Sequence, residues 1–324
     1  MHRLPLRVLD ALVLLWLVTT LTFALLHLAP GDPATLLIAP TATAEEAARV
    51  RATLGLDAPL LVQYARWLGG VLTGDLGTSL IRALPVRTVI AEALPVSLFL
   101  GGVSMLISFV AGTLLGLVQA LRAAPRVDRA LSLVSVALFA APSFWLALAL
   151  VALFTSGVAL LGLPEYLRLP AFGMQSPASA GDAAWSDRWR HAVLPLLVLS
   201  VPGVAGVARY ARQSIRDASG APFVTSAYAR GLSRSRVEWR YVLRLSLTPL
   251  VVLFGLTLPG VIAGSVFVEQ VFAWPGLGRA MMSAIGARDY PVVLGLTLVY
   301  AASVIAANLL ADWCLWLLDP RRRQ

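Results

Sequence analysis

The chain contains 324 residues, of which 58% are hydrophobic and 13% are charged. A soluble domain normally carries about 25% charged residues, so this composition excludes a soluble globular protein and predicts an all-α polytopic membrane protein. All 26 of its basic Lys-plus-Arg residues are arginines, and the lack of lysine excludes a Walker A phosphate loop and Schiff-base chemistry. The single cysteine, Cys314, excludes an intrachain disulfide, and the three histidines are scattered, so we expect neither a metal site nor catalytic residues.

Six apolar runs are long enough to cross a bilayer, which takes about 20 residues per helix. They cover residues 8–28, 96–121, 131–155, 192–208, 247–268 and 292–317. If both termini are cytoplasmic, 16 of the 26 arginines but only 4 of the 17 acidic residues fall on the cytoplasmic side. This positive-inside bias predicts that orientation. The net charge of +9 therefore reflects topology, and we expect contact with membrane lipid and no nucleic-acid partner.

The chain divides into three predicted parts. Residues 1–28 form a first transmembrane helix, 29–94 an external segment, and 95–324 a five-helix core that includes an arginine-rich loop at 209–246. The start of the chain is similar to a secretory signal peptide. However, its apolar core is about 20 residues long and no small-residue cleavage site follows, so we expect the helix to be retained.

The external segment is expected to have structure of its own. Thr43 and Glu46 form a capping-box pattern, which predicts a helix over 44–54. Asp57 is expected to cap a second helix, and 85–94 to form a short helix that leads into the second span. Two interpretations remain open: the segment covers the ends of the spans, or it is a landing platform for an external protein.

Four residues predicted to lie outside the membrane are candidates for contact with such an external protein: Asp75, Glu269, Trp274 and Arg288. Asp75 and Trp274 belong to turn sequences rich in glycine or proline. Glu269 is the acidic residue nearest the hydrocarbon edge, and we expect it to form an ion pair with Arg279 or Arg288. A proton relay through Glu269 is the alternative.

Three spans carry helix-breaking residues. Pro142 is expected to kink the third span. Pro202-Gly203 and Pro259-Gly260 lie in the fourth and fifth spans, where proline and glycine are tolerated if the backbone is buried in protein or lines a cavity. These four residues are candidates for a pathway wall or a hinge. The alternative is close helix packing by small residues.

Residues 222–249 are too charged to enter a bilayer and contain five arginines. Pro222 suits the first turn of a helix, and Gly231 suits the left-handed position just beyond a helix end. Ser233 is expected to cap a second helix. Two short helices at the membrane surface, with arginines on both, predict a docking element for a soluble partner.

No predicted span carries the paired ionisable residues that a proton-coupled pump needs, and no HExxH or membrane-depth Ser–His pair is present. We therefore expect the energy for any transport to come from a partner. A membrane-embedded enzyme and a self-contained secondary carrier are the alternatives. The enzyme would need facing polar catalytic residues within the spans, and the carrier would need inverted repeats and midplane charges.

The cytoplasmic loop resembles the EAA loop of ABC-importer permeases, because Ser226-Ala227 precede Gly231 at the family spacing and Pro249 follows. The whole chain is similar to the first membrane subunit of the dipeptide/oligopeptide/nickel permease family. The matching strings are PGDPA (30–34), LGLDAPL (54–60), GDLGTS (74–79), LPV (84–86), RHAVLP (190–195), ARGLSRSRV (229–237), VFAWPGLG (271–278), RDYPVV (288–293) and NLLADWCLWLLDPR (308–321). Thr225, Ser226, Tyr241 and Ser246 depart from the usual residues.

The resemblance implies a cytoplasmic coupling helix between spans four and five that rests in a groove of an ATPase. The coupling residues implied are Phe223, Ser226, Ala227, Arg230, Gly231, Leu232 and Arg234. Ala227 and Gly231 would be small so that the helix seats closely. On this interpretation a bulky charged side chain at Ala227 uncouples transport while the subunit remains inserted.

The resemblance also implies the partners and the location. The chain would pair with a second permease subunit, two cytoplasmic ATPases that bind ATP and Mg²⁺, and an extracytoplasmic solute-binding protein. It would reside in the bacterial inner membrane and would itself bind no cofactor. Peptides are the implied cargo, with nickel chelates, glutathione or glycosides as alternatives.

Overall fold

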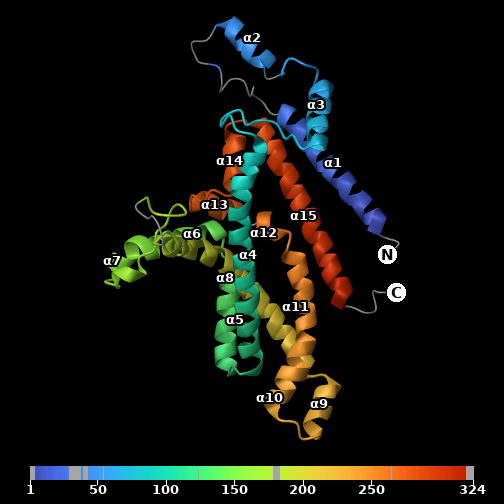
Figure 1. The fold of residues 1–324 in the computed structure, drawn as a ribbon. Coiled ribbons are helices and arrows are strands. Elements are labelled where there is room, and N and C mark those ends of the chain that lie inside the picture. Colours follow the sequence, from blue (N-terminus) through green and yellow to red (C-terminus); the bar gives the residue numbers. More distant parts are fainter. Residues whose placement is uncertain are drawn as a thin grey trace. The chain divides into compact units, whose positions relative to one another are not determined.

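A computed structural model describes residues 4–28, 38, 43–53, 55–122, 124–177, 183–263 and 265–318. The chain forms two compact units, each built of helices (Figure 1). Unit 1 consists of Met1–Val96 and Pro275–Ile305, and unit 2 of Ser97–Trp274 and Ala306–Gln324. The described elements are helical, and the β-structure among them is an isolated bridge between Thr78 and Pro85. The predicted all-α fold is confirmed.

Six described helical stretches are long and apolar enough to cross a membrane, which agrees with the predicted number. They are Leu9–Leu28, Val86–Leu121, Ser143–Leu160, Trp185–Ser219, Arg234–Thr257 and Tyr290–Trp313. The second and fourth helices extend well beyond the predicted apolar runs, because polar residues at their ends continue the helix.

Unit 1 is organised around packed aromatic side chains. It contains α1 (Leu4–Leu28), α2 (Ala44–Thr53), α3 (Leu60–Thr73), the start of α4 (Val86–Leu121), α14 (Leu277–Gly286) and the start of α15 (Tyr290–Leu318). Phe23 of α1 packs against Tyr64 and Trp67 of α3, with ring centroids 5.2 and 6.1 Å apart. The Tyr64 hydroxyl hydrogen-bonds Thr20 at 2.7 Å. These contacts hold α1 against α3 (Figure 1).

The capping box predicted at the start of α2 is confirmed. The Thr43 N–H donates to Glu46 Oε2 at 2.8 Å, and the Glu46 N–H donates to Thr43 Oγ1 at 3.3 Å. The cap predicted at Asp57 is wrong, because α3 begins after Pro59 and has no side-chain capping bond. Asp57 Oδ1 instead lies 3.6 Å from Arg51 Nε.

The separate short helix predicted over 85–94 is also wrong. The single helix α4 runs from Val86 to Leu121 and contains Pro95. A proline removes one backbone N–H, but an apolar helix packed among others tolerates that loss. The second span therefore continues into the segment that was expected to be external.

Unit 2 contains most of the helices that bear on function. They are the rest of α4, α5 (Pro125–Ala140), α6 (Ser143–Ala152), η2 (Leu153–Gly157), α7 (Val158–Leu160), η3 (Glu165–Leu167), α8 (Ala183–Ser219), α9 (Pro222–Ala229), α10 (Arg234–Val237), η4 (Glu238–Val242), α11 (Leu243–Thr257), α12 (Gly260–Ala263), α13 (Val266–Val271) and the end of α15.

Small residues bring α4 and α8 together. A Cβ atom at Gly112 would lie 2.7 Å from Val207 Cβ, and one at Gly116 would lie 2.6 Å from Ala211 Cβ. Neither distance is allowed between carbon atoms, so both positions require glycine. The spacing of four residues places Gly112 and Gly116 on one face of α4, which is a common pattern where membrane helices approach closely.

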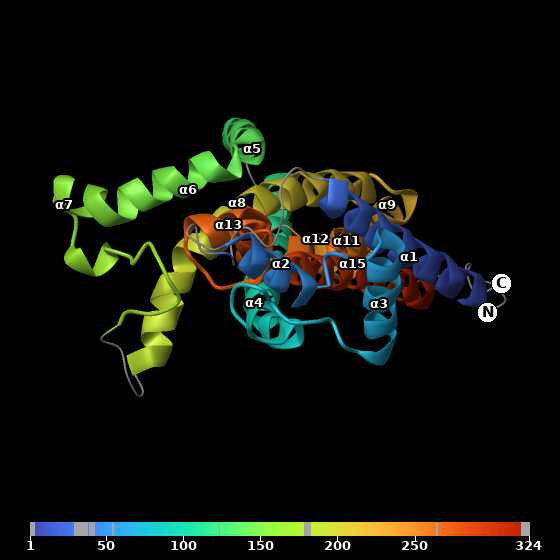
Figure 2. The same ribbon diagram turned by 90° about the horizontal axis from the view of Figure 1, so that it is seen from above.

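Two prolines break helices that were predicted to be continuous. Ala141 and Pro142 are extended, with ψ of 129° and 132°, so α5 ends and α6 leaves in another direction (Figures 1 and 2). The kink predicted at Pro142 is therefore a full break. In the fifth span, α11 ends at Thr257 and Pro259 lies in a turn before α12. Both breaks follow from the missing proline N–H and the clash of its ring with the preceding turn.

Candidate functional site

The arginine-rich loop folds as a helix, a turn and a second helix in unit 2 (Figure 1). Pro222 occupies the first turn of α9, as predicted. Gly231 has φ of 76°, and the following Leu232 N–H donates to the Ala227 carbonyl at 3.3 Å. Ser233 is the N-cap residue of α10, but its side chain makes no capping bond, so that detail of the prediction is wrong.

Helix α9 has a buried face and an exposed face. Val224 and Ala227 are 2% and 0% exposed, and they belong to an apolar core shared with α8, α10, η4 and α11. The core consists of Val207, Ala211, Ile215, Ala218, Val224, Ala227, Val237, Val242 and Leu250. The small size of Ala227 is thus required by the chain's own packing. Phe223, Ser226 and Arg230 are exposed, and these are the side chains that a soluble partner can reach.

A buried carboxylate ties α10 to the end of α4. Glu238 is 4% exposed and accepts hydrogen bonds from Arg122 Nη2 and Arg234 Nε, both at 2.7 Å. Arg234 Nη2 also donates to the Leu121 carbonyl at 3.1 Å. The Arg234–Glu238 pair follows from a spacing of four residues, but nothing local in the sequence indicates Arg122. Because a buried carboxylate requires its partners, α10 and the end of α4 are held together.

A second carboxylate ties α5 to α8. Arg212 donates to both carboxylate oxygens of Asp128, at 2.7 and 2.6 Å, and Arg216 Nη2 adds a third bond at 2.9 Å. The hydrogen bond from Arg212 is the main reason that the pKa of Asp128 lies below its usual value, although burial acts in the opposite direction. Asp128 also lies in the first turn of α5, where a negative charge is favoured.

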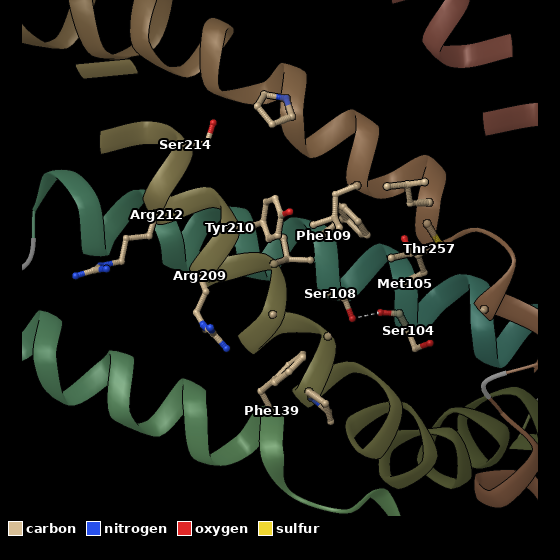
Figure 3. Close-up of a pocket in the computed structure, with 18 of the residues that line it drawn as sticks. Ser104, Met105, Ser108, Phe109, Phe139, Arg209, Tyr210, Arg212, Ser214 and Thr257 are labelled. Carbon is tan, nitrogen blue, oxygen red and sulfur yellow. Dashed lines mark hydrogen bonds between the residues drawn. The ribbon is translucent and has the colours of Figure 1, made fainter. Parts of the chain in front are cut away.

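A large cavity lies within unit 2, among α4, α5, α8 and α11 (Figure 3). Its volume is about 1630 Å³, and its wall combines apolar side chains with hydroxyl and charged groups. The polar lining residues are Ser104, Ser108, Ser132, Ser143, Arg209, Tyr210, Arg212, Gln213, Ser214, Asp217, Thr248, Thr257 and Ser265. A wall of this kind suits a solute that carries both apolar and hydrogen-bonding groups.

Three of the four predicted pathway or hinge residues line this cavity, namely Pro202, Gly203 and Gly260. A Cβ atom at Gly203 would collide with the side chain of Ser108, so close helix packing also applies at that position. A Cβ atom at Gly260 would meet no atom within 4 Å. Pro259 does not belong to the lining, and the structure assigns it to the turn between α11 and α12.

The four residues predicted to contact an external protein are not alike. Glu269 is 0% exposed and accepts hydrogen bonds from Ser97 and Ser265, and Trp274 is 3% exposed and stacks on Phe99. Both belong to unit 2 and are buried, so neither offers a docking surface in this conformation.

Asp75 and Arg288 belong to unit 1. Asp75 is exposed and its Oδ1 accepts the Gly77 N–H at 2.9 Å, whereas Arg288 is half-buried with φ of 51°. The neighbouring Asp289, which was not predicted from the sequence, accepts hydrogen bonds from the Ser79 hydroxyl and the Leu80 N–H. Asp289 therefore fixes the loop between α3 and α4 against the start of α15.

No group of three or more His, Cys, Asp or Glu side chains in the described part of the chain is placed to hold a metal ion. The helix–turn–helix and the cavity are two features of unit 2 that can each bind something. One offers a surface to a soluble partner, and the other offers a space to a solute.

The profile of the family "Binding-protein-dependent transport system inner membrane component" matches residues 112–324, and the profile of the N-terminal part of such components matches residues 1–100. The chain belongs to this family. It is therefore a multi-pass protein of the inner membrane and a transport component. Permeases of this kind act with a second permease, an ATPase and a solute-binding protein.

Curated relatives match along the whole chain. The oligopeptide transport system permease protein AppB of Bacillus subtilis is 33% identical over 97% of both chains. A putative peptide permease protein of Brucella suis is 37% identical over 97% of both. The glutathione transport system permease protein GsiC of Salmonella typhimurium is 33% identical over 98% of this chain and 97% of its own length.

Proposed function

We propose that this chain forms half of the translocation pathway in an ATP-driven, binding-protein-dependent importer of peptides. The observation that carries the proposal is the cavity of about 1630 Å³ in unit 2, because it gives a polar and apolar lined space within the family's core. Two of the full-length relatives are named for peptides and a third for glutathione. Glutathione is the second candidate cargo, since it is itself a tripeptide.

The energy would come from two cytoplasmic ATPases that bind ATP and Mg²⁺, and α9 would be the coupling helix. Its exposed residues Phe223, Ser226 and Arg230 support this role, because they form an accessible surface on a helix whose other face is anchored in unit 2. The Arg122–Glu238–Arg234 contacts would carry a displacement of this region to α4. A second permease subunit would complete the pathway, and a binding protein would deliver cargo from outside.

Reconstitution of the intact importer tests this function. The complex is purified with its partner subunits, placed in proteoliposomes with ATP and Mg²⁺ on the ATPase side, and supplied with binding protein and labelled trialanine on the other side. We expect accumulation that requires both ATP and binding protein. Uphill accumulation by this chain alone, or no ATP-dependent uptake of any peptide, would contradict the proposal.

A further inference from the structure

Three polar residues form a stripe along the cavity wall. Arg209, Gln213 and Asp217 all line the cavity and lie on α8 at intervals of four residues. Side chains at this spacing share one face of a helix. The stripe therefore presents a cation, an amide and a carboxylate, in that order, to the same space.

The cation of the stripe forms no ion pair with any residue that the structure describes. Arg209 is exposed, and its guanidinium carbon lies 5.6 Å from the centroid of the Phe139 ring. Figure 3 shows the side chain pointing from α8 toward Phe139. Among the residues that the structure describes, Arg209 forms no salt bridge, in contrast to Arg212, which is bonded to Asp128. Stacking on an aromatic ring leaves the N–H groups of an arginine free for a carboxylate.

The carboxylate of the stripe also lacks a cationic partner in the described part of the chain. Asp217 Oδ1 accepts a hydrogen bond from Gln213 Nε2 at 2.9 Å, whereas the adjacent Arg216 is bonded to Asp128. Asp217 lies in the last turn of α8, which ends at Ser219. The helix dipole places partial negative charge at that end, so an acidic residue there is unfavourable for the fold. A role in binding explains the position better than a role in stability.

We propose that this stripe binds a short zwitterionic peptide, with the peptide carboxylate at Arg209 and its ammonium group at Asp217. The inference rests on the proposed transport function and adds to it the groups that the pathway recognises. The two residues are eight positions apart, which is about 12 Å along a helix axis. An extended peptide of three or four residues has that length at about 3.4 Å per residue. Gln213 lies between the two charges, where an amide can donate to and accept from a peptide bond.

The test uses the intact importer in proteoliposomes and three probes: trialanine, trialanine amide and N-acetyltrialanine. Arg209→Gln should lower uptake efficiency for trialanine about tenfold, since it removes a charge-assisted bond, and should leave trialanine amide unchanged. Asp217→Asn should lower uptake of trialanine similarly and leave N-acetyltrialanine unchanged. Any preference of the binding protein is common to all variants, so it cancels when each is compared with the wild type.

Two further variants serve as controls. Arg209→Lys keeps the charge and should retain the preference for trialanine over its amide. Arg126→Gln removes an exposed arginine outside the cavity lining and should transport all three probes like the wild type. If Arg209→Gln slows trialanine and its amide equally, or slows neither, the inference is wrong while the transport function stands. If the wild type accumulates neither these probes nor any other peptide, both proposals fail.

Discussion

At the scale of single residues, two positions in the coupling region are constrained by the chain itself. Gly231 needs its positive φ of 76°, and Ala227 needs its small size because it is fully buried. From the sequence, the small size of Ala227 was explained by contact with an ATPase, and Gly231 was given both that explanation and a left-handed turn. The structure explains them by backbone conformation and by packing, so their substitution should affect stability first.

Replacing Gly231 by alanine should destabilise the protein by about 1 kcal/mol, because a Cβ atom is unfavourable in the left-handed region. No atom lies within 4 Å of that Cβ, so the cost is conformational and not steric. Thermal unfolding in detergent measures the effect. Gly69→Ala is the matched control, since Gly69 lies inside α3 with equal space and should become slightly more stable. Equal changes in thermal stability for Gly231→Ala and Gly69→Ala would contradict this explanation.

Replacing Ala227 by leucine should lower stability by about 1–3 kcal/mol through overpacking of a filled core. Ser226→Leu, on the exposed face of the same helix, should leave thermal stability nearly unchanged but weaken retention of the ATPase during purification. Unfolding curves and co-purification separate the two effects. A stable Ala227→Leu variant would show that α9 is not anchored as described.

At the scale of elements, carboxylates that each accept bonds from two arginines hold the helices of unit 2 together. Asp128 joins α5 to α8, and Glu238 joins α10 to α4. Both involve residues more than 80 positions apart in sequence, as the pairs Arg212–Asp128 and Arg122–Glu238 show. Such pairs carry no local sequence signal.

Asp128 should make stability depend on pH. Its pKa in the folded protein is below the value of 3.8 expected without interactions, because Arg212 and Arg216 bond the charged form. The stabilisation is therefore complete above that value and is lost as the pH falls through the lower folded pKa. Wild type should unfold at a higher temperature than Asp128→Asn at neutral pH, and this difference should shrink as the pH falls through the lowered folded pKa of Asp128. A constant difference across this range would contradict the assignment.

The contact between Arg122 and Glu238 can be measured with a double-mutant cycle. Arg122→Gln, Glu238→Gln and the double variant should give a coupling free energy of about 1 kcal/mol, reduced because Arg122 is partly exposed. Unfolding in detergent provides the values. If α4 and α10 move as one body, the single variants should also lower the ratio of transport to ATP hydrolysis in the intact complex. Additive changes in the free energy of unfolding would mean that the two side chains do not interact.

Some local patterns in the sequence predicted local features correctly, whereas the caps predicted at Asp57 and Ser233 were wrong. The capping box at Thr43 and Glu46, the first helical turn at Pro222 and the left-handed turn at Gly231 each depend on a few adjacent residues. The sequence was less informative about Pro142 and Pro259, because a proline within an apolar run is compatible with a kink or a break. Whether the proline kinks the helix or breaks it depends on the surrounding helices.

The cavity could be predicted only in part. Pro202, Gly203 and Gly260 were identified as candidates because their residue types suit a pathway wall. The stripe of Arg209, Gln213 and Asp217 was not identified as part of a pathway, because its charged and polar composition assigned it to the cytoplasmic loop. Only the packing of α8 beside the other helices places them at the same cavity. Gly112 and Gly116 were missed for a similar reason, since their partners on α8 lie about 95 residues away.

At the scale of the whole molecule, we propose a permease subunit that forms half of the pathway and depends on partner ATPases for energy. This arrangement requires the loop over 209–246 to face the cytoplasm. The distribution of arginines supports that orientation, with 16 of 26 on the predicted cytoplasmic side. The exposed face of α9 would then lie where an ATPase can bind it.

Labelling of a cysteine on α9 tests this central claim most directly. Ser226→Cys is introduced into a Cys314→Ala background, which removes the only native thiol. A membrane-impermeant maleimide is then applied to right-side-out and inside-out vesicles. We expect labelling only in inside-out vesicles, and protection from labelling when the ATPase subunits are bound. Labelling in right-side-out vesicles would contradict this claim.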